Sequence, residues 1–193
     1  NKSFSLEIWA KRSSMGEECM ISQGTANLAG LSVGFDSMDR FTAKISGYTL
    51  SSDESWTETS WHHWAISFNN TTGELHLFRD GSLLKSGSFH TQYKGSGRIQ
   101  LGKQTFDNPA PFTGNLHEFR IWNTNRTESK IVQNMNTQLN GMEQGLIGNW
   151  RLDEAFGTTV KDVVHYRNGI MHGTWSIYPS SSSVDICPVI SPK

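Results

Sequence analysis

The chain has 193 residues, with 17 basic and 18 acidic side chains and a net charge of −1. A chain of this length can bury one sizeable core, and so balanced a charge excludes an overall field that attracts nucleic acid or anionic lipid. No apolar stretch approaches the ~20 residues of a membrane helix, and the first residues, NKSFSLEIWAKR, lack the pattern of a secretion signal. These features predict one folded domain with a local site, no nucleic-acid partner and no direct insertion into a membrane.

The first two predicted strands alternate apolar and polar residues. In FSLEIWAK, residues 4–11, the even-numbered positions are apolar, whereas the odd-numbered positions carry polar side chains and Trp9. In WHHWAISF, residues 61–68, the even-numbered positions are again the more apolar, and Trp61 and His63 lie on the other face. Successive side chains of a strand point to opposite faces. Both segments are therefore predicted to be half-buried strands.

Turn residues separate several further strands. In GELHLFRDGSLLKSG, Asp80 and Gly81 form a dipeptide typical of tight hairpin turns. RIQL, residues 98–101, and GNLHEFRIW, residues 114–122, predict two more strands, separated by a proline-containing loop. Short strands between clusters of Gly, Asn, Asp and Ser predict an all-β sandwich.

One helical pattern follows the strand that ends at Trp122. Thr127 can act as the N-cap, and Glu128 suits the positive end of the helix dipole. The apolar residues that follow have helical spacing: Ile131, Val132 and Met135. We expect one short helix near residues 127–136. Strand patterns then return in GLIGNWRLDE, GTTVKDVV and NGIMHGTW, so we expect a domain over residues 1–178 and a Ser- and Pro-rich tail or linker over 179–193.

The strand 114–122 carries side chains that raise the question of catalysis. Strict alternation places His117 beside Phe119 on one face, and Leu116 with Glu118 and Arg120 on the other. Glu118 and Arg120 are suited to an ion pair. A His-Glu pair without a second histidine four residues on is not the helical motif of zinc proteases. We therefore interpret this strand as structural.

Trp9, Trp61 and His63 are candidates for ligand contact because they lie on the polar faces of their strands. An exposed aromatic ring can stack on a sugar ring. The alternative is that other segments cover these faces, so that the tryptophans pack and His63 forms a structural hydrogen bond. His62 and His63 are adjacent in a strand, point in opposite directions and cannot bind one metal ion together.

Two features indicate a secreted or cell-surface protein. The two cysteines, Cys19 and Cys187, permit one disulfide, which forms if the tail folds back over the sandwich. Glycosylation sequons occur at Asn1, Asn69, Asn70 and Asn125.

Five segments resemble a known family in their order and spacing: FSLEIWAKR, WHHWAISFNNTTGELHLFRDG, GRIQLG, FTGNLHEFRIWNTNRTESKIVQNMN and GLIGNWRLDEAFGTTVKD with the following NGIMHG. The chain resembles laminin-G-like, concanavalin A-like jelly-roll domains, the group that includes the pentraxins. The resemblance covers residues 4–175 and implies a two-sheet antiparallel jelly-roll sandwich.

The chain departs from this family at two points. Such domains usually have a strand before the FSLEIW element, and here only three residues precede Phe4. We therefore expect that element to leave unpaired backbone groups at a sheet edge, which another segment covers. Pentraxins hold calcium with an acidic cluster after the LG strand, where this chain has LGKQTFDN. Pentraxin-like binding of two calcium ions is not expected.

We expect a ligand site at one rim of the sandwich, in the loop 103–113 and the facing turn 24–28. Its candidate ligand-binding residues are Gln104, Phe106, Asp107 and Asn108. Asn27 and Asp107 are candidate ligands for a weakly bound calcium ion, together with backbone carbonyls and water. The alternative is that the loop is a rigid connector.

These observations predict a non-catalytic extracellular binding or adhesion module within a larger chain, which recognises a carbohydrate or a glycoprotein, with calcium as a candidate cofactor, or serves as an adhesive spacer. A glycosidase needs two carboxyl groups across the scissile bond, and the chain lacks the dense Glu-x-Asp-x-x-Glu pattern that commonly supplies them. The alternatives are a structural block of a surface filament or stalk and a glucanase-like hydrolase.

Overall fold

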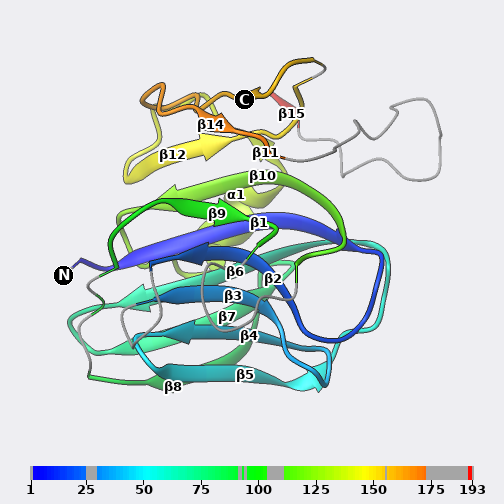
Figure 1. Ribbon diagram of the computed structural model, residues 1–193. Coiled ribbons are helices and arrows are strands. Elements are labelled where there is room, and N and C mark those ends of the chain that lie inside the picture. The colour runs from blue at the N-terminus through cyan, green and yellow to red at the C-terminus, as the bar shows by residue number, and fades with distance from the viewer. Residues whose placement is uncertain are drawn as a thin grey trace.

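The protein is a two-layer β-sandwich in the computed structural model (Figure 1). The structure describes residues 2–24, 30–90, 93, 95–103, 111–154 and 156–172, and the backbone of residues 191 and 192. One sheet has six strands in the order β12 (Leu146–Trp150), β10 (Gly114–Trp122), β1 (Phe4–Arg12), β6 (Trp61–Asn69), β7 (Glu74–Arg79) and β8 (Ser82–Ser88). The other has five, in the order β5 (Tyr48–Ser55), β4 (Arg40–Ile45), β3 (Leu31–Phe35), β2 (Glu18–Gln23) and β9 (Ile99–Leu101). Neighbouring strands in both sheets are antiparallel, which confirms the predicted all-β jelly-roll sandwich.

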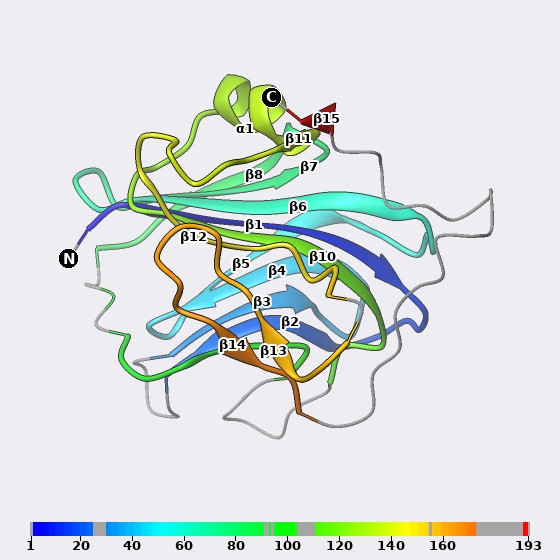
Figure 2. The same ribbon diagram turned by 90° about the horizontal axis from the view of Figure 1, so that it is seen from above.

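The smaller elements lie outside the two large sheets. The helix α1 (Glu128–Met135) follows β10, as predicted, and Figure 2 shows it on the side of the six-stranded sheet that faces away from the five-stranded one. Thr127 is the N-cap residue, but its side chain makes no capping hydrogen bond. Two short pairs complete the described strands: β13 (Thr159–Val160) with β14 (Gly169–Ile170), and β11 (Thr137–Gln138) with β15 (Ser191–Pro192). In the described part of the chain, no helix is long and apolar enough to cross a membrane.

The core lies between the inner faces of the two sheets. The six-stranded sheet contributes the even-numbered apolar residues of β1 and β6, as their alternation predicted. At the centre, the ring of Trp64 packs edge-on against Phe35, with 5.0 Å between the ring centroids, and lies 4.8 Å from the ring of Phe41. The sandwich is therefore held by aromatic contacts between β6 and the strands β3 and β4.

The strand β1 lies inside the six-stranded sheet, where it is hydrogen-bonded to β10 on one side and to β6 on the other. The expectation that the FSLEIW element leaves an unpaired edge is therefore wrong. Its two partner strands, β6 and β10, come later in the chain, and the jelly-roll topology places them on either side of β1.

A β-bulge in β10 changes which side chains face the core. Across from β1, Arg120 pairs with Glu7 and His117 pairs with Trp9, so the register shifts by one residue between the two pairs. The backbone of Glu118 has φ 50°, a conformation that non-glycine residues rarely adopt. Leu116 consequently packs against the core. The alternation predicted for Leu116 and His117 is wrong because the bulge reverses the faces.

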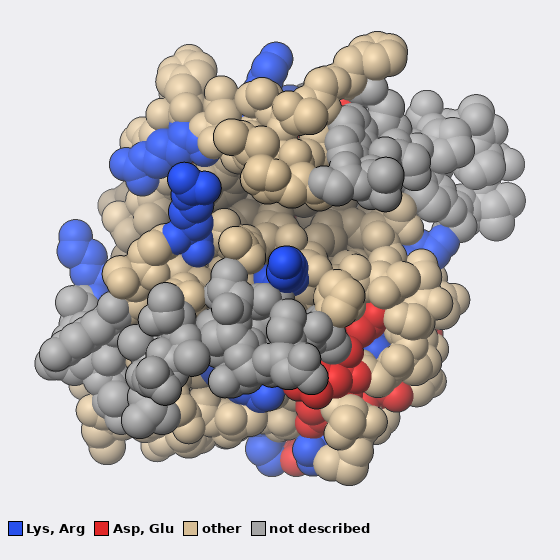
Figure 3. Space-filling view, viewed as in Figure 1, with Lys and Arg blue, Asp and Glu red and all other residues tan. Residues whose placement is uncertain are grey.

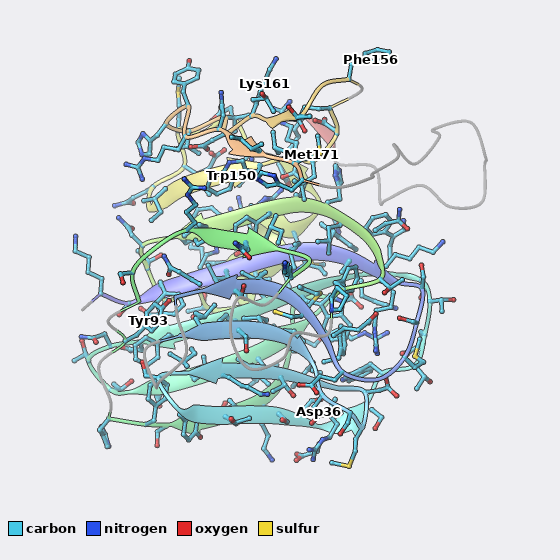
Figure 4. The ribbon with its side chains drawn as sticks, viewed as in Figure 1. Asp36, Tyr93, Trp150, Phe156, Lys161 and Met171 are labelled. Carbon is cyan, nitrogen blue, oxygen red and sulfur yellow. The ribbon has the colours of Figure 1, made fainter. Side chains whose placement is uncertain are left out.

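A small β-hairpin closes one end of the molecule, beside β12. Figure 4 shows Trp150 close to this hairpin and Phe156 pointing away from it into solvent. The indole of Trp150 donates a hydrogen bond of 3.1 Å to the carbonyl of Arg167, and its ring stacks on Phe119 with 5.5 Å between the ring centroids.

The turn of this hairpin is held by the buried carboxylate of Asp162. Four backbone N–H groups donate hydrogen bonds to it, those of Asn149, Val164, His165 and Arg167. Asp162 thereby holds the turn between β13 and β14 against β12.

Candidate functional site

Two of the predicted ligand-binding residues are buried. Trp9 is 4% exposed and His63 is 1% exposed, and their rings meet edge to face at 5.4 Å. The indole of Trp9 donates a hydrogen bond of 3.0 Å to the carbonyl of Met135 in α1. The expectation that these two side chains face a ligand is corrected, since α1 and its flanking chain cover this face. Trp61, at the start of β6, is partly buried.

The predicted rim site lies outside the described residues, which omit Asn27, Gln104, Phe106, Asp107 and Asn108. Both described flanks of the loop 103–113 contact β2: the carbonyl of Lys103 accepts a hydrogen bond of 2.6 Å from the hydroxyl of Ser22, and Pro111 forms a bridge with Cys19. The rim site stays a prediction, and so does calcium binding at Asn27 and Asp107. Among the residues that the structure describes, no cluster of three His, Cys, Asp or Glu side chains is placed to hold a metal ion.

The predicted modification sites differ in exposure. Asn125 is exposed, and Asn69 and Asn70 are partly buried. Cys19 lies in β2 with a free, buried thiol, whose pKa burial raises to about 12. Cys187 lies outside the described residues, so the predicted disulfide stays a prediction.

A cluster of charged side chains is buried between the six-stranded sheet and the chain around α1. Glu7 is fully buried and lies 3.0 Å from Nε of Arg126 and 3.6 Å from Nε2 of His63. Arg120 bonds Glu118 at 3.0 Å, as predicted, and the carbonyl of Asn134 at 2.9 Å. Burial opposes ionisation of Glu7, but His63 and the two arginines outweigh it and lower its pKa. The cluster is a structural clamp that fixes the segment after β10.

The five-stranded sheet carries a shallow hollow on its outer face. Its lining includes Ser32, Gly34, Thr42 and Lys44, and its volume of about 20 Å³ holds little more than one water molecule. Figures 3 and 4 show charged atoms gathered at the end of this face where Asp36 lies. Asp36 is paired there with Arg40 at 2.8 Å. This hollow is too small to hold a sugar ring.

A larger groove lies on the outer face of the six-stranded sheet, between β7 and β8 and the start of α1. Its volume is about 230 Å³. It is lined by Ser67, Asn69, Glu74, His76, Phe78, Leu83, Asn125, Arg126, Thr127 and Glu128. Sites for drug-sized ligands enclose ~300–1,000 Å³. The groove is therefore of a size for one small unit, such as a single sugar residue.

The alternation of β7 builds one wall of the groove. Leu75 and Leu77 point into the core, so Glu74, His76 and Phe78 share the outer face. The rings of His76 and Phe78 stack with 6.1 Å between their centroids. Leu83 of β8 adds an apolar side chain that is 45% exposed. This wall offers both polar groups and an apolar surface to a ligand.

The other wall is the chain from Asn125 to Glu128. The hydroxyl of Ser5 in β1 accepts a hydrogen bond of 2.9 Å from the backbone N–H of Arg126. The guanidinium of Arg126 lies 3.7 Å above the ring of Trp122 and donates to the side-chain oxygen of Asn134 at 3.0 Å. Burial lowers the pKa of Arg126, and Glu7 partly restores it. The charged cluster therefore positions this wall.

Sequence reasoning missed the groove. The signal for one wall was present, since the alternation of GELHLFRDG places Glu74, His76 and Phe78 on one face. The second wall comes from a segment more than 40 residues later, and nothing in its sequence indicates that it crosses beside β7. The charged cluster that directs this crossing involves residues from β1, β6 and β10.

Comparisons with known proteins place the chain in a family. The laminin G model described as the concanavalin A-like lectin/glucanases superfamily matches residues 1–132. No curated protein matches the chain.

Solved structures with a similar fold include a Bacteroides ovatus protein provisionally named a carbohydrate binding protein. It has a TM-score of 0.72 and 21% identity over 89% of this chain and 52% of its own, so the present chain spans about half its length. The carbohydrate-binding module CBM40 of a Ruminococcus gnavus sialidase, bound to α2,3-sialyllactose, has a TM-score of 0.58 and 15% identity, with 68% and 81% of the two chains covered. A heptameric pentraxin from Limulus polyphemus has a TM-score of 0.55 and 13% identity, with 68% of each chain covered.

At these identities, the similarity to solved structures concerns the fold. The family model spans more than half of the sequence, including most strands of both sheets and the start of α1. The chain belongs to the concanavalin A-like lectin/glucanases superfamily.

Proposed function

We propose that this domain is a non-catalytic module that binds carbohydrate in the groove between β7, β8 and α1. The observation that carries the proposal is the groove itself, a space of about 230 Å³ with carboxylate, amide, hydroxyl and imidazole groups on its walls. These are the groups that pair with sugar hydroxyls, and Leu83 adds a surface for the apolar face of a ring. The carbohydrate-binding names of two structurally similar proteins support the same function.

The absence of catalysis is part of the proposal. A glycosidase needs one carboxyl group that stays protonated and a second that is ionised. The carboxylates on the two walls are Glu74 and Glu128, and both are exposed to water. Glu74 also accepts a hydrogen bond of 2.8 Å from the hydroxyl of Thr72. The two walls therefore offer exposed carboxylates that suit hydrogen bonds to a sugar.

We further propose an extracellular or cell-surface setting within a larger chain. The exposed sequon at Asn125 supports this setting. Calcium assistance at Asn27 and Asp107 is a separate proposal that does not depend on the groove.

A glycan array on the purified domain tests these proposals, with and without calcium. We expect binding to at least one glycan, and we expect His76→Ala and Leu83→Ala to weaken it by roughly tenfold. Lys44→Ala, on the outer face of the other sheet, is the control and leaves binding unchanged. The variants Phe106→Ala and Asp107→Ala address the rim site.

Three results would overturn the assignment. An array without any bound glycan would contradict carbohydrate binding. Loss of binding in the rim variants with full binding in the groove variants would move the site to the loop 103–113. Release of reducing sugar from a bound oligosaccharide, abolished by Glu74→Gln or Glu128→Gln, would show a hydrolase.

A further inference from the structure

The two carboxylates that line the groove are Glu74 and Glu128. Within the described part of the chain, neither Glu74 nor Glu128 forms an ion pair, and the only side-chain partner of Glu74 is the hydroxyl of Thr72. One carboxylate comes from β7 and the other from the first turn of α1, so they stand on opposite walls. A ligand in the groove therefore meets negative charge from two sides.

The cation that lines the groove is already neutralised. Arg126 is 8% exposed, and its Nε lies 3.0 Å from the fully buried carboxylate of Glu7. Its Nη2 group donates to the carbonyl of Lys130 and the side-chain oxygen of Asn134. An acidic ligand that drew this guanidinium away from Glu7 would leave the buried carboxylate without its closest counter-charge, which is costly.

The helix dipole does not balance the two carboxylates. The start of a helix carries about half a positive charge, and the effect fades within the first turn. Glu128 occupies that first turn and offsets it. Two full negative charges against half a positive one leave the groove negative.

We propose that the groove selects neutral or amine-bearing sugars and rejects acidic ones such as sialic and uronic acids. This inference rests on the proposed function and specifies its ligand class. Neutral sugars donate hydroxyl hydrogens to Glu74 and Glu128, and hydrogen bonds to ionised groups are the stronger ones. An amino group adds attraction, whereas a sugar carboxylate meets like charge on both walls. The sialyllactose-bound CBM40 shares the fold with this domain, so the charge of the groove would distinguish the two ligand classes on a common scaffold.

The test compares sugars in sets of different charge: chitosan oligomers with free amines against the N-acetylated chitin oligomers, oligogalacturonate against its neutral methyl ester, and sialyllactose against lactose. Dissociation constants are measured by calorimetry at pH 7.5 in 20 mM and 500 mM NaCl. For wild type in low salt we expect each acidic sugar to bind at least roughly tenfold more weakly than its neutral partner. In 500 mM NaCl the ratio of the acidic to the neutral dissociation constant should move closer to one, because salt screens the repulsion between the carboxylates.

The double variant Glu74→Gln/Glu128→Gln removes both charges and keeps hydrogen-bonding oxygens. We expect it to reduce the preference against acidic sugars roughly tenfold, while affinity for the neutral sugar falls about three- to tenfold because two charge-assisted hydrogen bonds become neutral ones. Glu17→Gln is the matched control, because Glu17 is also exposed but lies beside Lys44 on the other sheet. It should leave the ratio unchanged. All three side chains are exposed, so the folds of the variants can be compared by thermal unfolding.

The outcomes separate the two proposals. Neutral and acidic sugars that bind equally well, with both affinities reduced by His76→Ala, would overturn the charge selection and leave carbohydrate binding in the groove intact. A preference against acidic sugars that persists in the double variant would overturn the role of Glu74 and Glu128. If no oligomer binds, or if binding ignores His76→Ala and Leu83→Ala, the groove is not the site and both proposals fail.

Discussion

His117 shows how one side chain in a bulged strand acquires a specific charge state. Its Nδ1 donates a hydrogen bond of 2.8 Å to the carbonyl of Arg151, so this nitrogen carries the hydrogen of a neutral ring. Burial lowers its pKa from 6.5 to about 4; Asp153 opposes this shift, and Arg120 adds to it. The imidazole therefore stays neutral in the folded protein at pH values where it becomes charged in the unfolded chain.

This difference predicts a loss of stability in mild acid. Between pH 6.5 and pH 4 the unfolded chain binds a proton at His117 that the folded protein does not, so unfolding is favoured as the pH falls. The stability that the neutral imidazole of His117 contributes to the folded protein is fully present above pH 6.5. About 2 kcal/mol of this stability is lost by pH 4.5. Urea unfolding of wild type and of His117→Asn across this range measures it. The variant should have a shallower slope, and equal slopes for the two proteins would contradict the assignment.

At the scale of the element, the pairing of β2 with β3 depends on a glycine. The register shifts between Cys19 and Ile21 on β2, opposite Gly34. A Cβ atom at Gly34 would lie 2.0 Å from the carbonyl oxygen of Glu18 and 2.9 Å from the Cα of Cys19. Backbone atoms in a sheet have little room to move, so the bulge requires glycine at this position.

Gly34→Ala should therefore destabilise the protein by about 2–4 kcal/mol, because β2 and β3 must separate to accept the methyl group. The control is Gly169→Ala in β14, where the nearest atom to an added Cβ is 3.7 Å away, an ordinary contact. Its effect should stay within about 0.5 kcal/mol. Chemical denaturation compares the two variants. A loss below about 1 kcal/mol in Gly34→Ala would mean that the strands accommodate the side chain.

Sequence patterns predict the strands more accurately than their irregularities. Alternation correctly assigns the faces of β1 and β6, and the Asp80-Gly81 dipeptide correctly marks the β7–β8 turn, with positive φ at both residues. The bulge at Glu118 is not predictable in this way, because one extra residue reverses the faces on one side of it, here those of Leu116 and His117, without changing the pattern of residue types. The groove is missed for a related reason. Its walls are adjacent in space but distant in sequence, and a buried charged cluster brings them together.

At the scale of the whole molecule, the two outer faces of the sandwich differ. The chain from β10 to β11 crosses the outer face of the six-stranded sheet, and the buried side chain of Ile131 in α1 packs there against Ala65 and Phe78. Phe78 also lines the groove, so the contact that attaches the helix shapes the floor of the site. Val132, the next residue in the predicted apolar stripe, is 51% exposed and contributes little to this packing.

Ile131→Ala should cost about 2–5 kcal/mol of stability, because it leaves a cavity between helix and sheet. It should also weaken glycan binding, since the wall from Asn125 to Glu128 leads directly into this helix. Val132→Ala is the matched control and should change stability by no more than about 0.5 kcal/mol. Thermal unfolding and the glycan array measure the two effects. Normal binding by a strongly destabilised Ile131→Ala would show that the groove forms without the helix.

The position of Arg126, in both the buried charged cluster and the groove wall, links ligand occupancy to local opening of the chain. Residues 123–137 can detach from the sheet only when the contact between Arg126 and Glu7 breaks, and the groove loses a wall in the same event. A sugar that binds only the attached form stabilises it by about 2.7 kcal/mol at a hundredfold excess over its dissociation constant. Where backbone amides of this segment exchange with solvent through such opening, their hydrogen exchange should slow about a hundredfold with ligand, while exchange in β2, β3 and β4 stays the same.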